Sequence, residues 1–200
     1  MTNEQVRSWC IREMEEHGHV VFTNDAKRFN LNIVGIRSKS RVAGEFDDTL
    51  CVFWKFCGEW QTRVYPITTD PGKFYLINRL LNPEGCAILA PGQYRGVYKI
   101  DLHGGKYPAL CQRLGNVRVF RDGNRDDIID MRPEKERTGR YGINIHRAAP
   151  AGVTKHVGRY SAGCQVFQQA QHFAAFMHLC NAASIQFGNR FTYTLLEESP

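Results

Sequence analysis

Short runs of alternating apolar and polar residues recur along the chain, separated by turns rich in Gly and Pro. An alternation with a period of two predicts strands that bury one face. The predicted strands span residues 18–23, 31–37, 49–56, 59–68, 86–90, 96–101, 109–113, 117–120, 141–146 and 190–196. Many short strands with few helices are typical of a β-sandwich or a barrel, so the pattern predicts a mainly β domain.

Two segments show the 3.6-residue period of a helix instead. The first spans residues 4–16 and ends at a His-Gly pair. The second runs from about residue 168 to 183 and carries one core-facing stripe at i, i+3, i+4 and i+7, formed by Phe173, Phe176, Met177 and Cys180. We expect residues 1–17 to pack as an added amino-terminal helix on one domain of residues 18–200, because no linker or repeat divides the chain.

The 200-residue chain has the composition of a folded protein. Hydrophobic residues make up 42% and aromatic residues 12%, which allows a substantial core and argues against disorder. The formal net charge is +6, and a spread positive charge favours anionic partners such as nucleic acid, lipid head groups or cell-wall polymers. Ordinary solvated surface charge is the simpler explanation. No apolar run has the length of a membrane span, so we expect no membrane insertion.

Cysteine usage and the amino terminus both indicate synthesis in a reducing compartment. Seven cysteines are present, with no Cys-x-x-Cys pair, which suits reduced and buried thiols better than a disulfide scaffold. The first 19 residues intersperse apolar residues with Arg and Glu and do not form a signal peptide. We therefore expect synthesis in the cytoplasm, with another exit route for any work outside it.

The candidate chemistry lies in residues 141–167, where a histidine and a cysteine stand 18 residues apart. The run Gly-Ile-Asn-Ile-His places His146 at a strand end, on the face opposite its two isoleucines. Gly163 permits a tight turn before Cys164 and can aim main-chain N–H groups at one point. An imidazole that takes the proton of a thiol makes it a nucleophile, so a catalytic Cys164 is expected to be partly thiolate near neutral pH.

His146, 14 further residues and then Ser161-Ala162-Gly163-Cys164 resemble the signature of the L,D-transpeptidase catalytic domain, a β-rich family of cysteine enzymes that act on peptidoglycan. The resemblance is firm over residues 141–167 and loose over the preceding strands. Position by position, it implies Cys164 as nucleophile, His146 as base, the main-chain carbonyl of Arg147 as the group that orients the imidazole, the N–H groups of Gly163 and Cys164 as oxyanion donors, and Ser161 as a supporting hydroxyl.

The resemblance also implies the reaction. Enzymes of this family attack peptidoglycan stem peptides after an L-residue, form a thioester, and pass the acyl group to an amine or to water. They need no metal and no organic cofactor. The chain is thus expected to be an L,D-transpeptidase, or an L,D-carboxypeptidase or endopeptidase. The absent signal peptide favours hydrolysis by a phage-borne enzyme or a secreted effector that acts at the bacterial cell wall or periplasm. Ala162 replaces the family's usual His, which affects substrate contacts and the acyl acceptor.

Other interpretations of the same residues stay open. One is a non-catalytic module with the same fold, either wall-binding or a structural part of a virion. Another is a different cysteine peptidase that cleaves ordinary all-L peptides, and His146 and Cys164 also suit plain packing roles. Tyr94, His103 and Tyr107 lie in loops that can line a substrate groove, although ordinary turns are the default. The pattern does not specify an oligomeric state.

Metal and nucleic-acid sites are weaker candidates. Asp122, Asn124 and Asp126 resemble the start of a calcium loop, but Asp127 and Pro133 occupy the positions of the required Gly and Glu. No cysteine pair completes a zinc site, so we expect no metal. The alternating aromatic residues of the central hairpin are typical of core strands, so nucleic acid is not an expected partner.

Overall fold

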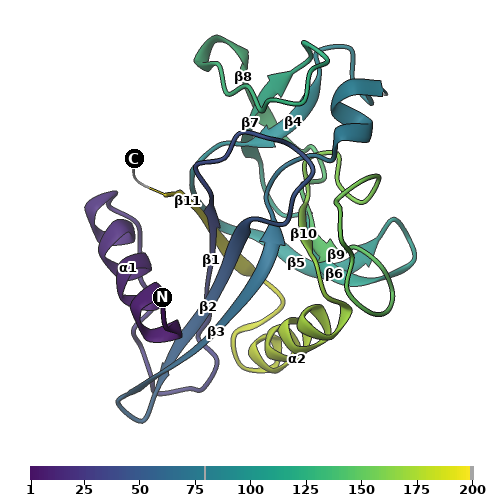
Figure 1. Cartoon of the computed structure of the whole chain (residues 1–200). Helices are drawn as coiled ribbons and strands as arrows, with labels where there is room; N and C mark the ends of the chain where they lie inside the picture. Colours follow the sequence, from purple (N-terminus) through teal and green to yellow (C-terminus); the bar gives the residue numbers. More distant parts are fainter. Residues whose placement is uncertain (79, 199–200) are drawn as a thin grey trace.

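A computed structural model describes residues 1–78 and 80–198, and it has the mainly β fold that the sequence predicts (Figure 1). The strands are β1 (Asn32–Arg37), β2 (Asp48–Phe56), β3 (Glu59–Thr68), β4 (Cys86–Leu89), β5 (Gly92–His103), β6 (Tyr107–Gln112), β7 (Val117–Asp122), β8 (Glu136–Gly139), β9 (Ile145–Arg147), β10 (Gln165–Phe167) and β11 (Phe191–Glu197). The helices are α1 (Asn3–Glu16) and α2 (Ala170–Phe187), with a short π-helix at Phe74–Asn78 and a 3-10 turn at Pro133–Lys135.

Within the described residues, eight strands close into a barrel in the order β1-β11-β5-β6-β9-β10-β3-β2. β1 pairs with β11 in parallel, and so does β9 with β10, whereas the other neighbours are antiparallel. Closure removes the free strand edges that an open sheet would expose. β4, β7 and β8 form a separate sheet of three strands, which stands above the barrel in Figure 1.

The main hydrophobic core fills the barrel and continues under α2. Trp54, Tyr98 and Tyr193 are among its largest buried side chains. Helix α2 lays its apolar stripe on this core, and Phe176 and Cys180 are fully buried there. The predicted helix periodicity is confirmed, and the helix extends four residues beyond its expected end, to a glycine.

Helix α1 packs on the outside of the barrel against β2, β3 and β11 (Figure 1). A capping box between Thr2 and Gln5 fixes its first turn. Cys10 and Met14 bury one side of the helix in a second apolar cluster that includes Phe53. The predicted amino-terminal helix is therefore confirmed. Neither of these two helices, nor any other described one, has the length and apolar character that a membrane crossing requires.

Residues 18–23 were expected to form a strand, and that prediction is wrong. The Asn32 side chain donates to the carbonyl of Phe22 and accepts from its N–H. The Gln93 side chain holds Val20 in the same way. These side-chain amides satisfy the backbone groups that a neighbouring strand would otherwise satisfy, so the segment runs extended without joining a sheet.

Gly35 in β1 makes room for a polar side chain inside the barrel. A Cβ at this position would collide with the hydroxyl of Tyr193. That buried hydroxyl donates to Oε1 of Gln165 at 2.8 Å. Because Gln165 directly follows Cys164, the absence of a side chain on β1 helps to fix the start of β10.

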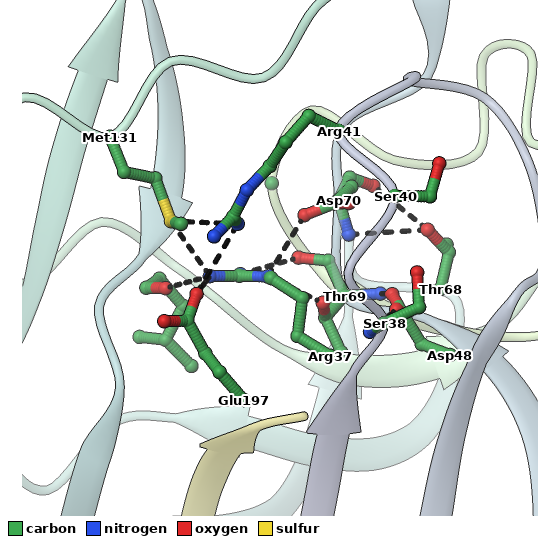
Figure 2. Close-up of polar contacts among 12 residues, drawn as sticks. Arg37, Ser38, Ser40, Arg41, Asp48, Thr68, Thr69, Asp70, Met131 and Glu197 are labelled. Atoms are coloured by element: carbon green, nitrogen blue, oxygen red, sulfur yellow. Dashed lines mark hydrogen bonds and ion pairs between the residues drawn. The ribbon is translucent and has the colours of Figure 1, made fainter. Parts of the chain in front are cut away.

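The guanidinium of Arg37 is fully buried between the end of β1, the segment after β3 and the end of β4 (Figure 2). Its Nε lies 2.9 Å from Oγ1 of Thr69 and 3.1 Å from Oδ1 of Asp70. Its Nη1 donates to the carbonyl of Leu89 at 3.0 Å. One side chain therefore joins the barrel to the three-stranded sheet.

Two buried carboxyl groups, of Asp48 and Asp70, share this region with the buried guanidinium of Arg37. Asp48 accepts from the N–H of Ser38 at 2.7 Å and from the N–H of Thr69 at 2.5 Å. Burial, with Asp70 nearby, raises the pKa of Asp48 to about 7. Burial also raises the pKa of Asp70, against the opposing effect of Arg37. Asp48 is therefore partly protonated near neutral pH.

Replacing Arg37 by Ala is expected to lower the free energy of unfolding by about 3–5 kcal/mol, because it leaves buried carboxylates without their cation. Urea unfolding followed by circular dichroism measures the change. Arg95→Ala, at an exposed position of β5, is the matched control and should stay within about 0.5 kcal/mol of the parent. If Arg37→Ala lowers the free energy of unfolding no more than the control does, Arg37 does not stabilise the fold in this way.

Asp48 should make the free energy of unfolding fall as the pH rises from about 4 to about 7. The folded state keeps the Asp48 proton to a higher pH than the unfolded chain, whose pKa is about 3.9, so unfolding releases protons across that window. Asp48→Asn should be less stable at low pH, since its amide has one acceptor oxygen for two N–H groups, but should show a flatter pH dependence. Urea midpoints at several pH values test this, and an unchanged slope in the variant refutes it.

Candidate active site

Cys164 stands directly before β10, at the end of a turn whose geometry is closely determined. The hydroxyl of Ser161 donates to the carbonyl of Cys164 at 2.9 Å and accepts from the N–H of Gly163 at 3.1 Å. Gly163 has a φ of 125°, and a Cβ there would collide with the carbonyl of Ala87. Only glycine fits this position, and it does so because the turn packs directly against β4.

The oxyanion donors differ from those that the resemblance implies. The N–H of Gly163 is not free to bind an oxyanion, because it donates to Ser161, two residues earlier. In the resting structure Gly163 therefore shapes the turn, and its role as an oxyanion donor stays a prediction. In the described chain no hydrogen bond occupies the N–H of Cys164. The structure thus leaves one of the two expected main-chain donors available.

The pairing of β9 and β10 brings the predicted histidine and cysteine to neighbouring strands. His146 lies opposite Val166 in the parallel ladder, and Cys164 immediately precedes β10. The N–H of Gln165 donates to the carbonyl of Asn144 at 2.9 Å, which anchors the start of the ladder. Residues 18 apart in sequence therefore lie on adjacent strands of the barrel.

The imidazole of His146 is oriented by a main-chain carbonyl. Its Nδ1 lies 2.8 Å from the carbonyl oxygen of Arg147, the contact that the resemblance implies. The hydroxyl of Tyr107 lies 3.3 Å from the same nitrogen and 3.2 Å from the same carbonyl. Since a carbonyl only accepts, Nδ1 carries the proton and Nε2 is left as the basic nitrogen.

The thiol of Cys164 does not bond to this imidazole in the resting structure. Its Sγ donates to the carbonyl of Gly142 and accepts from the N–H of Asn144, each at 3.4 Å. Among the described residues no hydrogen bond joins it to His146. Both thiol contacts have ordinary lengths for sulfur. Catalytic hydrogen bonds often form only when substrate is bound.

Burial keeps both members of the pair neutral. It lowers the pKa of His146 to about 3, with a smaller contribution from the neighbouring His103. It raises the pKa of the Cys164 thiol to about 11, although the Asn144 N–H opposes the shift. The raised pKa favours the neutral thiol in the resting structure, and a partly ionised Cys164 near neutral pH stays a prediction.

His103 and Asn144 belong to the site in a way that the sequence did not reveal. The His103 ring stacks on His146 with 3.9 Å between centroids. Oδ1 of Asn144 accepts from the N–H of Gln112, so its amide nitrogen faces Nδ1 of His103 at 3.0 Å. Because that nitrogen can only donate, Nδ1 of His103 is unprotonated and its proton lies on Nε2. The sequence offered His103 and Tyr107 only as groove contacts.

A pocket of about 370 Å³ opens at Cys164. The described residues that line it are Leu81, Asn82, Gly85, Cys86, Ala87, Arg121, Tyr141, Gly142, Ile143, Ala162 and Cys164. Ala162 forms part of this wall, and a larger side chain there would fill some of the pocket. The thiol therefore meets the pocket from one side, while His146 and His103 lie outside its lining.

Over residues 1–78 and 80–198, no group of three His, Cys, Asp or Glu side chains is placed to hold a metal ion. The calcium-like pattern folds into a polar turn in which Asn124 bonds to Asp126 and Asp130. All seven cysteines are free thiols, and Cys57 is the exposed one, at the turn between β2 and β3.

Comparison of the chain with known protein families, curated proteins and solved structures finds no match. The resemblance to L,D-transpeptidases therefore depends on residues 141–167 and on the geometry that they adopt.

Alkylation of the folded protein by iodoacetamide should modify Cys57 first at pH 7, because this thiol is exposed. Modification of Cys164 should be slow at pH 7 and rise steeply as the pH approaches 11, since only the thiolate reacts and burial disfavours it. Peptide mapping by mass spectrometry follows both sites. Equal rates at pH 7 would show that Cys164 is already ionised.

Proposed function

We propose that the chain is a cysteine-dependent acyl-transfer enzyme of the L,D-transpeptidase type that acts on peptidoglycan stem peptides through a thioester. Cys164 is the nucleophile and His146 the base. The acyl group passes to water, as in an L,D-carboxypeptidase or endopeptidase, or to an amine. The site of action in this proposal is the bacterial cell wall or periplasm, and the net charge of +6 suits an anionic polymer.

The observation that carries the proposal is the orientation of His146 by the carbonyl of Arg147 at 2.8 Å, on the strand beside Cys164. This contact leaves Nε2 as a proton acceptor without any carboxylate partner. A buried histidine in a packing role also bonds its ring nitrogens, so the tautomer alone does not identify a base. Here the tautomer, the adjacent thiol and the pocket at that thiol occur together, which is the arrangement that a thiol nucleophile requires.

In the first half-reaction, the Cys164 side chain turns away from Gly142 and Asn144 toward His146. Nε2 of His146 takes the thiol proton as sulfur attacks the carbonyl carbon of the L-residue. The N–H of Cys164 donates to the oxyanion that forms. The carbon–nitrogen bond then breaks, and the departing amine takes the proton from His146. Because burial favours the neutral forms of both groups, proton transfer coincides with carbon–sulfur bond formation.

In the second half-reaction, His146 again acts as base. It takes a proton from water or from an acceptor amine, which attacks the thioester carbon. The carbon–sulfur bond breaks and the thiolate recovers its proton from the imidazolium. The positions of Tyr107 and Arg147 stay unchanged through both halves, because they hold the nitrogen that does not exchange protons.

A second candidate is a non-catalytic module that holds a wall fragment in the same pocket. One observation favours it: the thiol has no hydrogen bond to His146, and burial raises its pKa to about 11. Turnover distinguishes the two, since a binding module leaves its ligand unchanged.

Incubation with purified stem peptides that end in a D-residue should release that residue, or exchange it for an added amine, as detected by mass spectrometry. Cys164→Ser should abolish the reaction. His146→Gln should slow it by about 10²–10⁴-fold, the usual contribution of a general base. The matched control is Cys57→Ser, which removes the exposed thiol at the turn between β2 and β3. This variant should retain full activity.

Full activity of Cys164→Ser contradicts the mechanism. Binding of stem peptides without any product, in the unaltered chain and in the variants alike, supports the non-catalytic module instead. Cleavage of all-L peptides at equal rates would assign the site to another class of cysteine peptidase.

A further inference from the structure

Arg121 places a positively charged side chain in the lining of the pocket at Cys164. It lies on β7 of the three-stranded sheet and is the charged side chain among the described residues that line this pocket. Its Cζ lies 4.7 Å from the centre of the Tyr141 ring, and its Nη1 donates to the carbonyl of Gly85 at 3.1 Å. No described residue bonds to its Nη2. The guanidinium is thus held in place with one terminal nitrogen unused.

Three other arginines of this sheet region form ion pairs with carboxylates. Arg118 pairs with Glu136, Arg132 with Asp130, and Arg137 with Glu84. Among the described residues no such ion pair includes Arg121. Arg121 differs from these three arginines in lining the pocket at Cys164 without a carboxylate partner in the described chain.

The carboxylates that share a second hollow with Arg121 are already engaged. Glu84 and Asp130 have the partners just named, and Asp122 accepts from the N–H of Asp130 at 2.8 Å. Among the described residues, none of these three carboxylates forms an ion pair with Arg121. A half-buried guanidinium that stacks on an aromatic ring and keeps a free nitrogen is prepared for an anionic ligand.

We propose that Arg121 binds the free α-carboxylate of a carboxyl-terminal D-residue whose amide bond Cys164 attacks. Arginine forms charge-assisted hydrogen bonds with carboxylates, and these are stronger than neutral ones. The pocket of about 370 Å³ is at the small end of ligand pockets, which suits the end of a peptide better than a continuing strand. This inference rests on the proposed function. It makes the enzyme act on chain ends, removing or exchanging a terminal D-residue instead of cutting within a cross-link.

Two stem peptides that differ only at the carboxyl terminus test the proposal, one with the free acid and one with the carboxamide. Release of the terminal residue, followed by mass spectrometry, gives kcat/KM for each. The unaltered chain should prefer the free acid by about 10–100-fold, as expected for a hydrogen bond to a charged group. Equal values for the two peptides overturn the assignment of Arg121 while leaving acyl transfer by Cys164 intact.

Substitutions at Arg121 test whether this side chain causes the preference for the free acid. In Arg121→Gln, kcat/KM for the free acid should fall toward the value for the carboxamide, and Arg121→Lys should keep part of the preference. Arg118→Gln, an exposed arginine on the same strand, is the matched control and should keep all of it. A full preference in Arg121→Gln overturns the proposal. No turnover of either peptide by the unaltered chain contradicts the proposed function, and this inference with it.

Discussion

A cation without access to water is costly unless its partners surround it, and Arg37 imposes that constraint at the centre of this molecule. Its guanidinium must find acceptors from several segments at once. Those acceptors lie on the loop after β3 and at the end of β4, so the barrel and the three-stranded sheet meet where Arg37 requires it (Figure 2). The buried carboxylate of Asp70 completes the pairing. Arg37 thus contributes a buried polar link between the small sheet and the barrel, beside the apolar packing of Leu89 and Val119 in the shared core.

The same loop reaches the candidate active site. The carbonyl of Thr69, which accepts from Arg37, also lies 3.4 Å from Nε2 of Gln165, next to Cys164. Three residues further on, the N–H of Gly72 donates to the carbonyl of Ser161 at 2.9 Å. The turn that presents Cys164 is therefore supported by the segment that Arg37 holds. The pocket wall that carries Arg121 belongs to the sheet on the other side of this junction, which explains why a distant arginine and the thiol can line one pocket.

The fold and the site were predictable to different extents, for physical reasons. Alternation, a two-residue turn and the 3.6-residue period are local features of the sequence. The first two predict the β2–β3 hairpin, and the third predicts both helices. Residues 18–23 were predicted as a strand in the same way, but their backbone groups bond to the side chains of Asn32 and Gln93 instead of to a neighbouring strand. The contact of His146 with the next residue's carbonyl is also local. His103 and Arg121 meet the site only through strand register and sheet docking, which a pattern of residue types does not specify. The raised pKa of the Cys164 thiol could not be predicted for the same reason, since the surroundings of this thiol depend on the whole fold.

The proposed mechanism requires an acyl group on the sulfur of Cys164, and this covalent intermediate can be sought directly. The folded protein would be mixed with a stem peptide, quenched in acid within milliseconds to seconds, and examined by mass spectrometry of the intact chain and of its peptides. If the mechanism holds, the protein gains a mass equal to the donor acyl group. The added group lies on the peptide that contains Cys164 and is lost on treatment with hydroxylamine. Product formation without any adduct on that peptide, or an adduct on a different cysteine, would contradict it.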